Sequence, residues 1–230
     1  MKIAYTGLDL PEGKQKYNDE LFSDLVDKFR PAKVSPYYFE LRPDAYTSSD
    51  VIAIRNEQLL DLLILDMEKV EARLSRTEDA TERAVLEKCL AQLEEMKPIC
   101  DLPLDESERA VVKALGPLSF TPTVVSGNPS PDADELFREA LDKAGMMFFY
   151  TVGKQEVHAW LVRKGADAVT CADKIHSDLA RGFIKAELVS CEDMLSAHNM
   201  QDARSRGLAQ LVDRDYVVPE HSILDIRFNV

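Results

Sequence analysis

The segment Ile175-His-Ser-Asp-Leu-Ala-Arg-Gly-Phe183 lies at the centre of the part of the chain whose pattern decides the fold. Two runs rich in β-branched and aromatic residues precede it, at Phe148–Val152 and Val157–Arg163. A third run, Phe183–Ser190, follows it directly, and a fourth, Ser222–Val230, closes the sequence. Such runs are typical of strands. We therefore expect a small mixed sheet packed on helices in this last part of the chain.

Charge is distributed unevenly along the sequence. The formal net charge of the 230 residues is -13. Residues 147–230 hold 10 Lys/Arg and 12 Asp/Glu, so residues 1–146 carry -11 of that charge. An acidic chain opposes nonspecific binding to phosphate backbones. RNA contact is therefore expected only in residues 147–230, which also contain all four histidines.

The composition, 45% hydrophobic and 30% charged, is typical of a globular protein. The apolar run Leu62–Leu65 is too short to cross a bilayer. Residues 1–10 lack the pattern of a signal peptide, so a cytoplasmic location and no membrane partner are expected. The cysteines form no CxxC pair, and we expect free buried thiols and no metal site. They are Cys89, Cys100, Cys171 and Cys191.

Five short motifs in the last part of the chain resemble a known family. They are Phe148-Phe-Tyr-Thr-Val-Gly153, Val157-His-Ala-Trp-Leu-Val-Arg-Lys-Gly165, Ile175-His-Ser-Asp178, Asp215-Tyr-Val-Val218 and Arg227-Phe-Asn-Val230. In this order they resemble the C-terminal TGS-type domain of YchF-type GTP/ATP-binding proteins, a branch near the Obg GTPases. The resemblance implies a β-grasp fold for residues 147–230, nucleotide binding and hydrolysis, and association with ribosomes.

The first residues follow the order strand, glycine-containing loop and helix that a P-loop requires. Lys2–Thr6 reads as a buried strand, Gly7–Gln15 as the loop, and Lys16–Phe29 as an amphipathic helix. In a working P-loop, backbone N–H groups and a Lys hold phosphates, and a Ser/Thr hydroxyl ligates Mg²⁺. Gly7, Gly13 and Lys14 are therefore the candidate phosphate-binding residues.

The same loop departs from a working P-loop in two respects. The spacing from Gly7 to Gly13-Lys14 is one residue too long, and Gln15 stands where the Ser/Thr ligand belongs. We therefore favour a strand-to-helix connector over an NTPase site.

The resemblance places two further nucleotide motifs in residues 1–146. Asn128, at the end of the expected strand Phe120–Ser126, matches an Asn that reads the purine base, but Pro131 stands where an acidic partner belongs. Asp44 matches the switch segment, but the glycine expected after it is absent. A plain turn is the favoured reading at Asn128. The resemblance also implies that a large piece of the G domain is missing after Asp44.

Residues 55–97 carry two apolar stripes at helical spacing, separated by the polar segment Ser75–Thr81. We expect two antiparallel helices in a coiled-coil hairpin. The hairpin is interpreted as a packing element or rigid arm, with homo-oligomerisation or partner docking at its tip as alternatives. Asp105 and Glu108 predict a capping box that starts a further helix ending at Gly116-Pro117. Another helix is expected over Asp132–Gly145.

His176, Arg181 and Lys185 are the candidate RNA or partner surface. His176 and Asp178 could form an acid/base couple, but no nucleophile is placed beside them, and residues two apart on a helix do not face each other. The resemblance implies that Ile175-His-Ser-Asp178 is a structural signature of the TGS-type domain. We favour that reading over catalysis and name no catalytic residue.

The predicted fold class is α/β in two domains: a reduced, P-loop-like domain at 1–146 with the 55–97 hairpin, and a β-grasp, TGS-like domain at 147–230. The leading hypothesis is a non-hydrolytic interaction module derived from a YchF-type GTPase, binding ribosome or RNA, with no cofactor. The alternative is a residual ATP- or GTP-binding protein that uses Mg²⁺. A third hypothesis is a structural subunit that dimerises through the hairpin.

Overall fold

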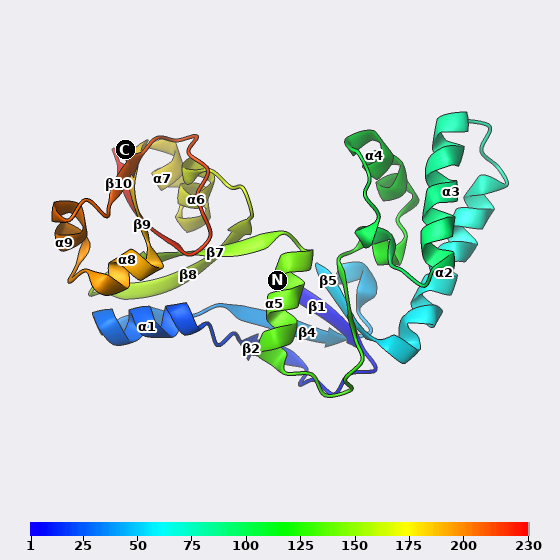
Figure 1. Ribbon diagram of the computed structural model, residues 1–230, viewed down its shortest axis with the longest axis horizontal. Helices are drawn as coiled ribbons and strands as arrows, with labels where there is room; N and C mark the ends of the chain where they lie inside the picture. The colour runs from blue at the N-terminus through cyan, green and yellow to red at the C-terminus, as the bar shows by residue number, and fades with distance from the viewer. Residues whose placement is uncertain (230) are drawn as a thin grey trace. The chain divides into compact units, whose positions relative to one another are not determined.

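The computed structural model describes residues 1–229; Val230, the last residue of the predicted C-terminal domain, lies outside the described residues. The chain forms two compact units, each with its own sheet. The first unit comprises Met1–Gln15 and Phe39–Ala144, and the second comprises Lys16–Tyr38 and Gly145–Val230. The α/β class is confirmed (Figure 1).

The sheet of the first unit has five strands in the order β2-β4-β1-β5-β6. Strand β1 lies at its centre and pairs in parallel with β4 and β5, and β5 pairs in parallel with β6. Residues 51–54 are all buried, as expected for a parallel strand covered on both faces. The strands are β1 Lys2–Thr6, β2 Gly13–Lys16, β4 Tyr38–Pro43, β5 Val51–Arg55 and β6 Thr123–Ser126.

Two helices of the first unit begin at aspartate side chains that act as N-caps. Asp105 and Glu108 form the predicted capping box of α4, and Gly116 ends that helix in the left-handed region at φ 66°. Asp132 caps α5, whose Phe137 stacks on Phe39 with ring centroids 4.2 Å apart. The helices are α2 Asn56–Leu74, α3 Ala80–Glu94, α4 Glu106–Leu115 and α5 Ala133–Lys143, with 3-10 turns η1 Tyr46–Ser48, η2 Ile99–Asp101 and η3 Leu118–Phe120.

The two helices predicted in residues 55–97 are present as α2 and α3, which lie side by side (Figure 1). Asp79 caps α3, and Arg73 of α2 pairs with Glu82 of α3 at 2.8 Å. The buried carboxylate of Asp66 accepts the N–H groups of Leu118 and Ser119 at 2.6 and 2.7 Å. One apolar cluster joins the hairpin to α4 and the sheet, so the hairpin is a packed part of the first unit.

The second unit contains a six-stranded mixed sheet in the order β10-β9-β11-β7-β8-β3. Strand β11 pairs in parallel with β7 and antiparallel with β9, and β7 and β8 are antiparallel. Helix α6 covers the core on one face. The strands are β3 Lys33–Ser35, β7 Met146–Val152, β8 Glu156–Arg163, β9 Phe183–Ser190, β10 Gln210–Val212 and β11 Ser222–Phe228; the helices are α1 Glu20–Phe29, α6 Ala168–Ile175, α7 Ser177–Arg181, α8 Cys191–Ser196 and α9 Met200–Ser205.

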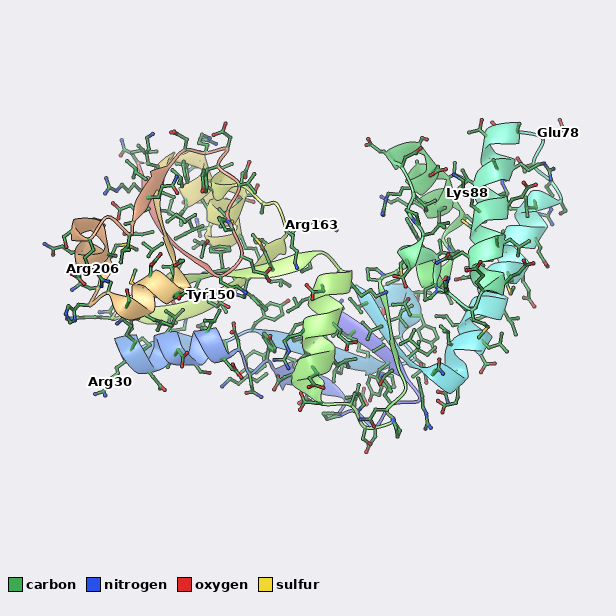
Figure 2. All side chains as sticks on the ribbon, viewed as in Figure 1. Arg30, Glu78, Lys88, Tyr150, Arg163 and Arg206 are labelled. Atoms are coloured by element: carbon green, nitrogen blue, oxygen red, sulfur yellow. The ribbon has the colours of Figure 1, made fainter. Side chains whose placement is uncertain are left out.

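Residues 16–38 differ from the sequence-based division at residue 146, because they pack with the second unit. Helix α1 places Phe22 against Tyr150, whose hydroxyl donates to the Asp19 carboxylate. Tyr150, on β7, is labelled in Figure 2. Residues 33–43 supply two strands, β3 and β4, which lie in different sheets. Pro36, which has no N–H to give to a ladder, lies between them.

Candidate functional site

The carboxyl edge of the first sheet is where ligands of parallel α/β sheets usually bind. Strands β1, β4, β5 and β6 run in one direction, so their ends lie on this edge. The Thr6 hydroxyl lies 2.6 Å from Asp44 Oδ1 and 2.5 Å from the Tyr46 hydroxyl. Asp44 adopts φ 53°, a strained conformation for a non-glycine residue. The Thr6 hydroxyl is thus already occupied by protein groups.

Gly13 and Lys14 lie in strand β2, so the expected passage from this loop directly into a helix is wrong. Helix α1 begins only at Glu20, and the Asp19 carboxylate caps it by accepting the Phe22 N–H. The reason is that residues 13–16 pair along the edge of the first sheet instead of turning into a helix. No helix N-terminus therefore faces Gly13 and Lys14 from this connection.

Lys14 is exposed and lies near Glu40 of the neighbouring strand. The hydrogen bond from Arg42 lowers the pKa of Glu40, and the charges of Lys2 and Lys14 lower it less. Lys14 therefore already has a carboxylate in its surroundings.

Gly7 follows β1 in the left-handed region, at φ +70°. A Cβ atom at this position would lie 1.9 Å from Gln58 Oε1. That oxygen is buried and has no hydrogen-bond partner among residues 1–229. The glycine is needed here because the Gln58 side chain occupies the space beside it.

The surroundings of Tyr5 are acidic. Burial raises the pKa of the Tyr5 hydroxyl, and the charges of Glu12, Asp44 and Asp9 raise it further. A phosphate placed near this edge would meet the same three carboxylates, and like charges repel. The edge thus disfavours the anion that the loop was expected to hold.

Asn128 lies in a tight turn after β6. Its Oδ1 accepts the Ser130 N–H at 3.0 Å, and its own N–H donates to Ser126 Oγ at 3.1 Å. Such side-chain-to-backbone bonds are typical of an Asx turn. The turn also lies beside the loop after β1, because the Asp9 N–H donates to the Pro129 carbonyl at 2.7 Å.

In the second unit, His176 and Arg181 both lie beside the Asp178 carboxylate. His176 Nδ1 lies 3.7 Å from Asp178 Oδ2, and Arg181 pairs with Asp178 Oδ1 at 2.7 Å. Lys185, on β9, pairs instead with Asp213 at 2.6 Å. The structure therefore groups His176 with Arg181 and gives Lys185 a separate partner.

Sequence patterns did not indicate a buried ionic cluster on the second sheet. The Glu187 side chain is only 5% exposed and forms ion pairs with Arg204 and Arg227. The pairing of β9 with β11 brings Arg227 to Glu187, and helix α9 supplies Arg204. The cluster ties α9 and β11 to β9.

Nucleophilic chemistry has little support in the described chain. Burial raises the pKa of the Cys89 thiol to about 11, and those of Cys171 and Cys191 to about 12. These thiols are protonated at neutral pH, and only a thiolate is a good nucleophile.

Among residues 1–229, no group of three or more His, Cys, Asp or Glu side chains could hold a metal ion. No helix within those residues has the length and apolarity to span a membrane.

Comparison with known proteins gives consistent matches. Residues 146–229 match the YchF-GTPase_C family, described as a protein of unknown function (DUF933). The Ribosome-binding ATPase YchF of Bacillus subtilis (strain 168) is 28% identical over 237 residues, covering 74% of this chain and 65% of that protein. The Ribosome-binding ATPase YchF of Mycoplasma pneumoniae (strain ATCC 29342 / M129 / Subtype 1) is 42% identical over 78 residues, covering 34% of this chain and 22% of that protein. The chain thus spans less than two thirds of these relatives.

A solved structure, that of the Schizosaccharomyces pombe YchF GTPase, superposes with a TM-score of 0.80 at 15% identity, covering 99% of this chain and 97% of that one. This likeness concerns the fold alone. The family match and the sequence relatives make the chain similar to the YchF-type proteins, with residues 146–229 as a YchF-type C-terminal domain.

Proposed function

We propose that this chain is a non-hydrolytic interaction module that associates with the ribosome through its second unit, in the cytoplasm. The observation that carries the proposal is the position of Gly13 and Lys14 in strand β2, so that no helix begins directly after them. Phosphoryl transfer depends on positioned phosphates, metal and charge stabilisation. The Gln15 amide in place of a hydroxyl acts against the metal ligand of a P-loop, and the carboxylates around Tyr5 act against bound phosphate.

Ribosome association is supported by the relatives, which are named Ribosome-binding ATPase YchF. The YchF-type C-terminal domain is the part of this chain that matches a family directly. A TGS-like, β-grasp character of this domain fits its mixed sheet and belongs to the same proposal. Within it, the exposed His176 and Arg181, with Lys185 nearby in sequence, are the proposed RNA-facing residues.

Co-sedimentation with ribosomal particles tests the proposed contact. Arg181→Glu with Lys185→Glu should reduce the bound fraction severalfold at low salt, because each replaces a cation by an anion. The matched control is Lys88→Glu with Lys97→Glu, which makes the same charge change at paired cations of the first unit. Equal loss in both variants, or no co-sedimentation of the unmodified chain, would reject the contact.

A residual ATP- or GTP-binding protein is the second candidate. It is favoured by the bond between Asp9 and Pro129, which sets the loop after β1 beside the Asn128 turn. A nucleotide would need these two loops as neighbours, with Gly7, Gly13 and Lys14 on the phosphate side and Mg²⁺ between the phosphates. Calorimetry with ATP and GTP, with and without Mg²⁺, separates the candidates. Micromolar binding that Lys14→Ala abolishes would replace the leading proposal.

A third candidate is a dimer formed through the hairpin of α2 and α3. The observation in its favour is that α2 leaves large aliphatic side chains exposed. Light scattering over a hundredfold concentration range would show a rising mass if this candidate is correct.

A further inference from the structure

In helix α2, the segment Leu59–Leu65 carries apolar side chains on its exposed side as well as on its core-facing side. Six of the seven residues in Leu59–Leu65 are Leu or Ile, with Asp61 the exception. Leu59, Leu62 and Leu63 are buried in the core of the first unit. A helix that is apolar on all sides is normally covered on all sides. The core of the first unit covers only one side of this helix.

The remaining side of this half-helix presents aliphatic and acidic groups together. Leu60, Ile64 and Leu65 are 45%, 41% and 47% exposed. With residues four apart as neighbours, two adjacent rows form: Leu60, Ile64 and Glu68 in one, and Glu57, Asp61 and Leu65 in the other. We name these six residues the α2 patch. Each aliphatic side chain of the patch therefore has a carboxylate beside it.

The carboxylates of the α2 patch are poorly compensated within the chain. Glu57 pairs with Arg55 at 2.6 Å. Asp61 and Glu68 have no ion-pair partner among residues 1–229, and both are exposed. Glu57 and Asp61 stand four apart, where like charges destabilise a helix. Exposed leucines and unpaired like charges are both costs that a complementary partner would remove.

We propose that the α2 patch is a docking surface for a basic amphipathic helix of a partner protein. Aliphatic side chains of that helix would pack between Leu60, Ile64 and Leu65, and its Lys or Arg groups would meet Asp61 and Glu68. A helix is the fitting shape, because ridges four residues apart on α2 pack into the grooves of a second helix. An exposed helix offers no free backbone edge to an added strand.

Charge decides among the other possible occupants. A second copy would bring the same acidic rows against each other, and like charges across an interface oppose association. Anionic lipid and RNA would meet the same repulsion. The patch lies in the first unit, so this docking is independent of the ribosome contact proposed for the second unit.

The test uses the full chain and a fluorescent Leu/Lys peptide about four turns long, with leucines at helical spacing. A Leu/Glu peptide with the same leucine positions is the control probe. Anisotropy should show binding of the Leu/Lys peptide that weakens as salt rises. Binding of both peptides with equal affinity would overturn the proposal, because charge would then play no part.

Three double variants locate the binding surface. Leu60→Ser with Ile64→Ser should weaken binding about tenfold, and Asp61→Asn with Glu68→Gln about fivefold, from lost apolar contact and lost ion pairs. Glu87→Gln with Glu94→Gln is the matched control, since these exposed carboxylates of α3 have the same seven-residue spacing. Its affinity should change less than about twofold. All six positions are exposed, so circular dichroism should show an unchanged fold.

Two results would assign the α2 patch differently. Equal weakening in the α3 control would mean that the peptide senses general acidity. A mass that doubles with concentration, and stops doubling in Leu60→Ser with Ile64→Ser, would make the patch a self-association surface.

Discussion

The two sheets carry their charges in different ways. At the carboxyl edge of the first sheet, Asp9, Glu12 and Asp44 all act on Tyr5 and raise its pKa. On the second sheet, Glu187 lies between Arg204 and Arg227. Like charges held near one another set up a field that repels anions, whereas paired charges cancel. An anionic ligand is therefore disfavoured at the first edge and must displace existing partners on the second sheet.

The units also differ in how the chain builds them. The first unit is interrupted after residue 15 and resumes at residue 39. The intervening segment supplies β3 and α1 to the second unit, where Tyr17 stacks on Phe148 at 5.8 Å and Phe22 lies by Tyr150. The YchF-type C-terminal domain of this chain is thus completed by residues that precede it by more than a hundred positions.

Phe22→Ala gives the largest expected effect on this division. The variant removes a buried ring that packs against Tyr150. This loss should lower the free energy of unfolding of the second unit by about 3 kcal/mol. Trp160, the only tryptophan, lies on β8 and reports on this unit by fluorescence. The control Phe137→Ala should move the circular dichroism transition of the first unit and leave the Trp160 transition in place. If Phe22→Ala instead moved the transition of the first unit and left the Trp160 transition in place, residues 16–38 would belong to the first unit.

Gly7→Ala should destabilise the first unit by about 2 kcal/mol, from positive φ and the collision with Gln58. Urea denaturation followed by circular dichroism measures the loss. Gln58→Gly should recover part of it in the double variant, because the colliding side chain is gone. Gly13→Ala is the matched control, with φ +96° but nothing within 4 Å of the added Cβ. If Gly7 and Gly13 variants lose equal stability, the contact with Gln58 is unimportant.

These glycines mark the limit of what sequence patterns can show. The run Lys2–Thr6 and the capping box at Asp105 predict their elements correctly, because local periodicity and capping decide them. Gly13-Lys14 has the composition of a phosphate loop, yet it forms an edge strand, because its pairing with β4 is a tertiary event. Sequence patterns also do not indicate the ion pairs of Glu187, because its partners are 17 and 40 positions away. A motif is recognised from neighbouring residues, whereas the contacts that a binding site needs come from residues distant in sequence.

Glu187→Gln should cost about 1–2 kcal/mol, because two arginines lose their shared anion while remaining partly exposed to water. Unfolding followed by Trp160 fluorescence measures it. Asp213→Asn, which breaks the exposed pair with Lys185, is the control and should change stability by less than about 0.5 kcal/mol. Equal, small losses would show that the pairing on the second sheet contributes little to its stability.

The smallest expected effect is a pH dependence in the second unit. His158 stacks on Trp160 with ring centroids 3.6 Å apart, and burial lowers its pKa although Glu156 nearby raises it. The folded state therefore favours neutral His158, and in the unfolded chain the group binds a proton at higher pH. Stability from this source is present above the ordinary histidine pKa of about 6.5 and is lost as the pH falls below it.

His158→Gln should flatten the fall in unfolding free energy between about pH 7 and pH 5.5. A slope that is the same in both proteins would assign the pH dependence to the carboxylates instead.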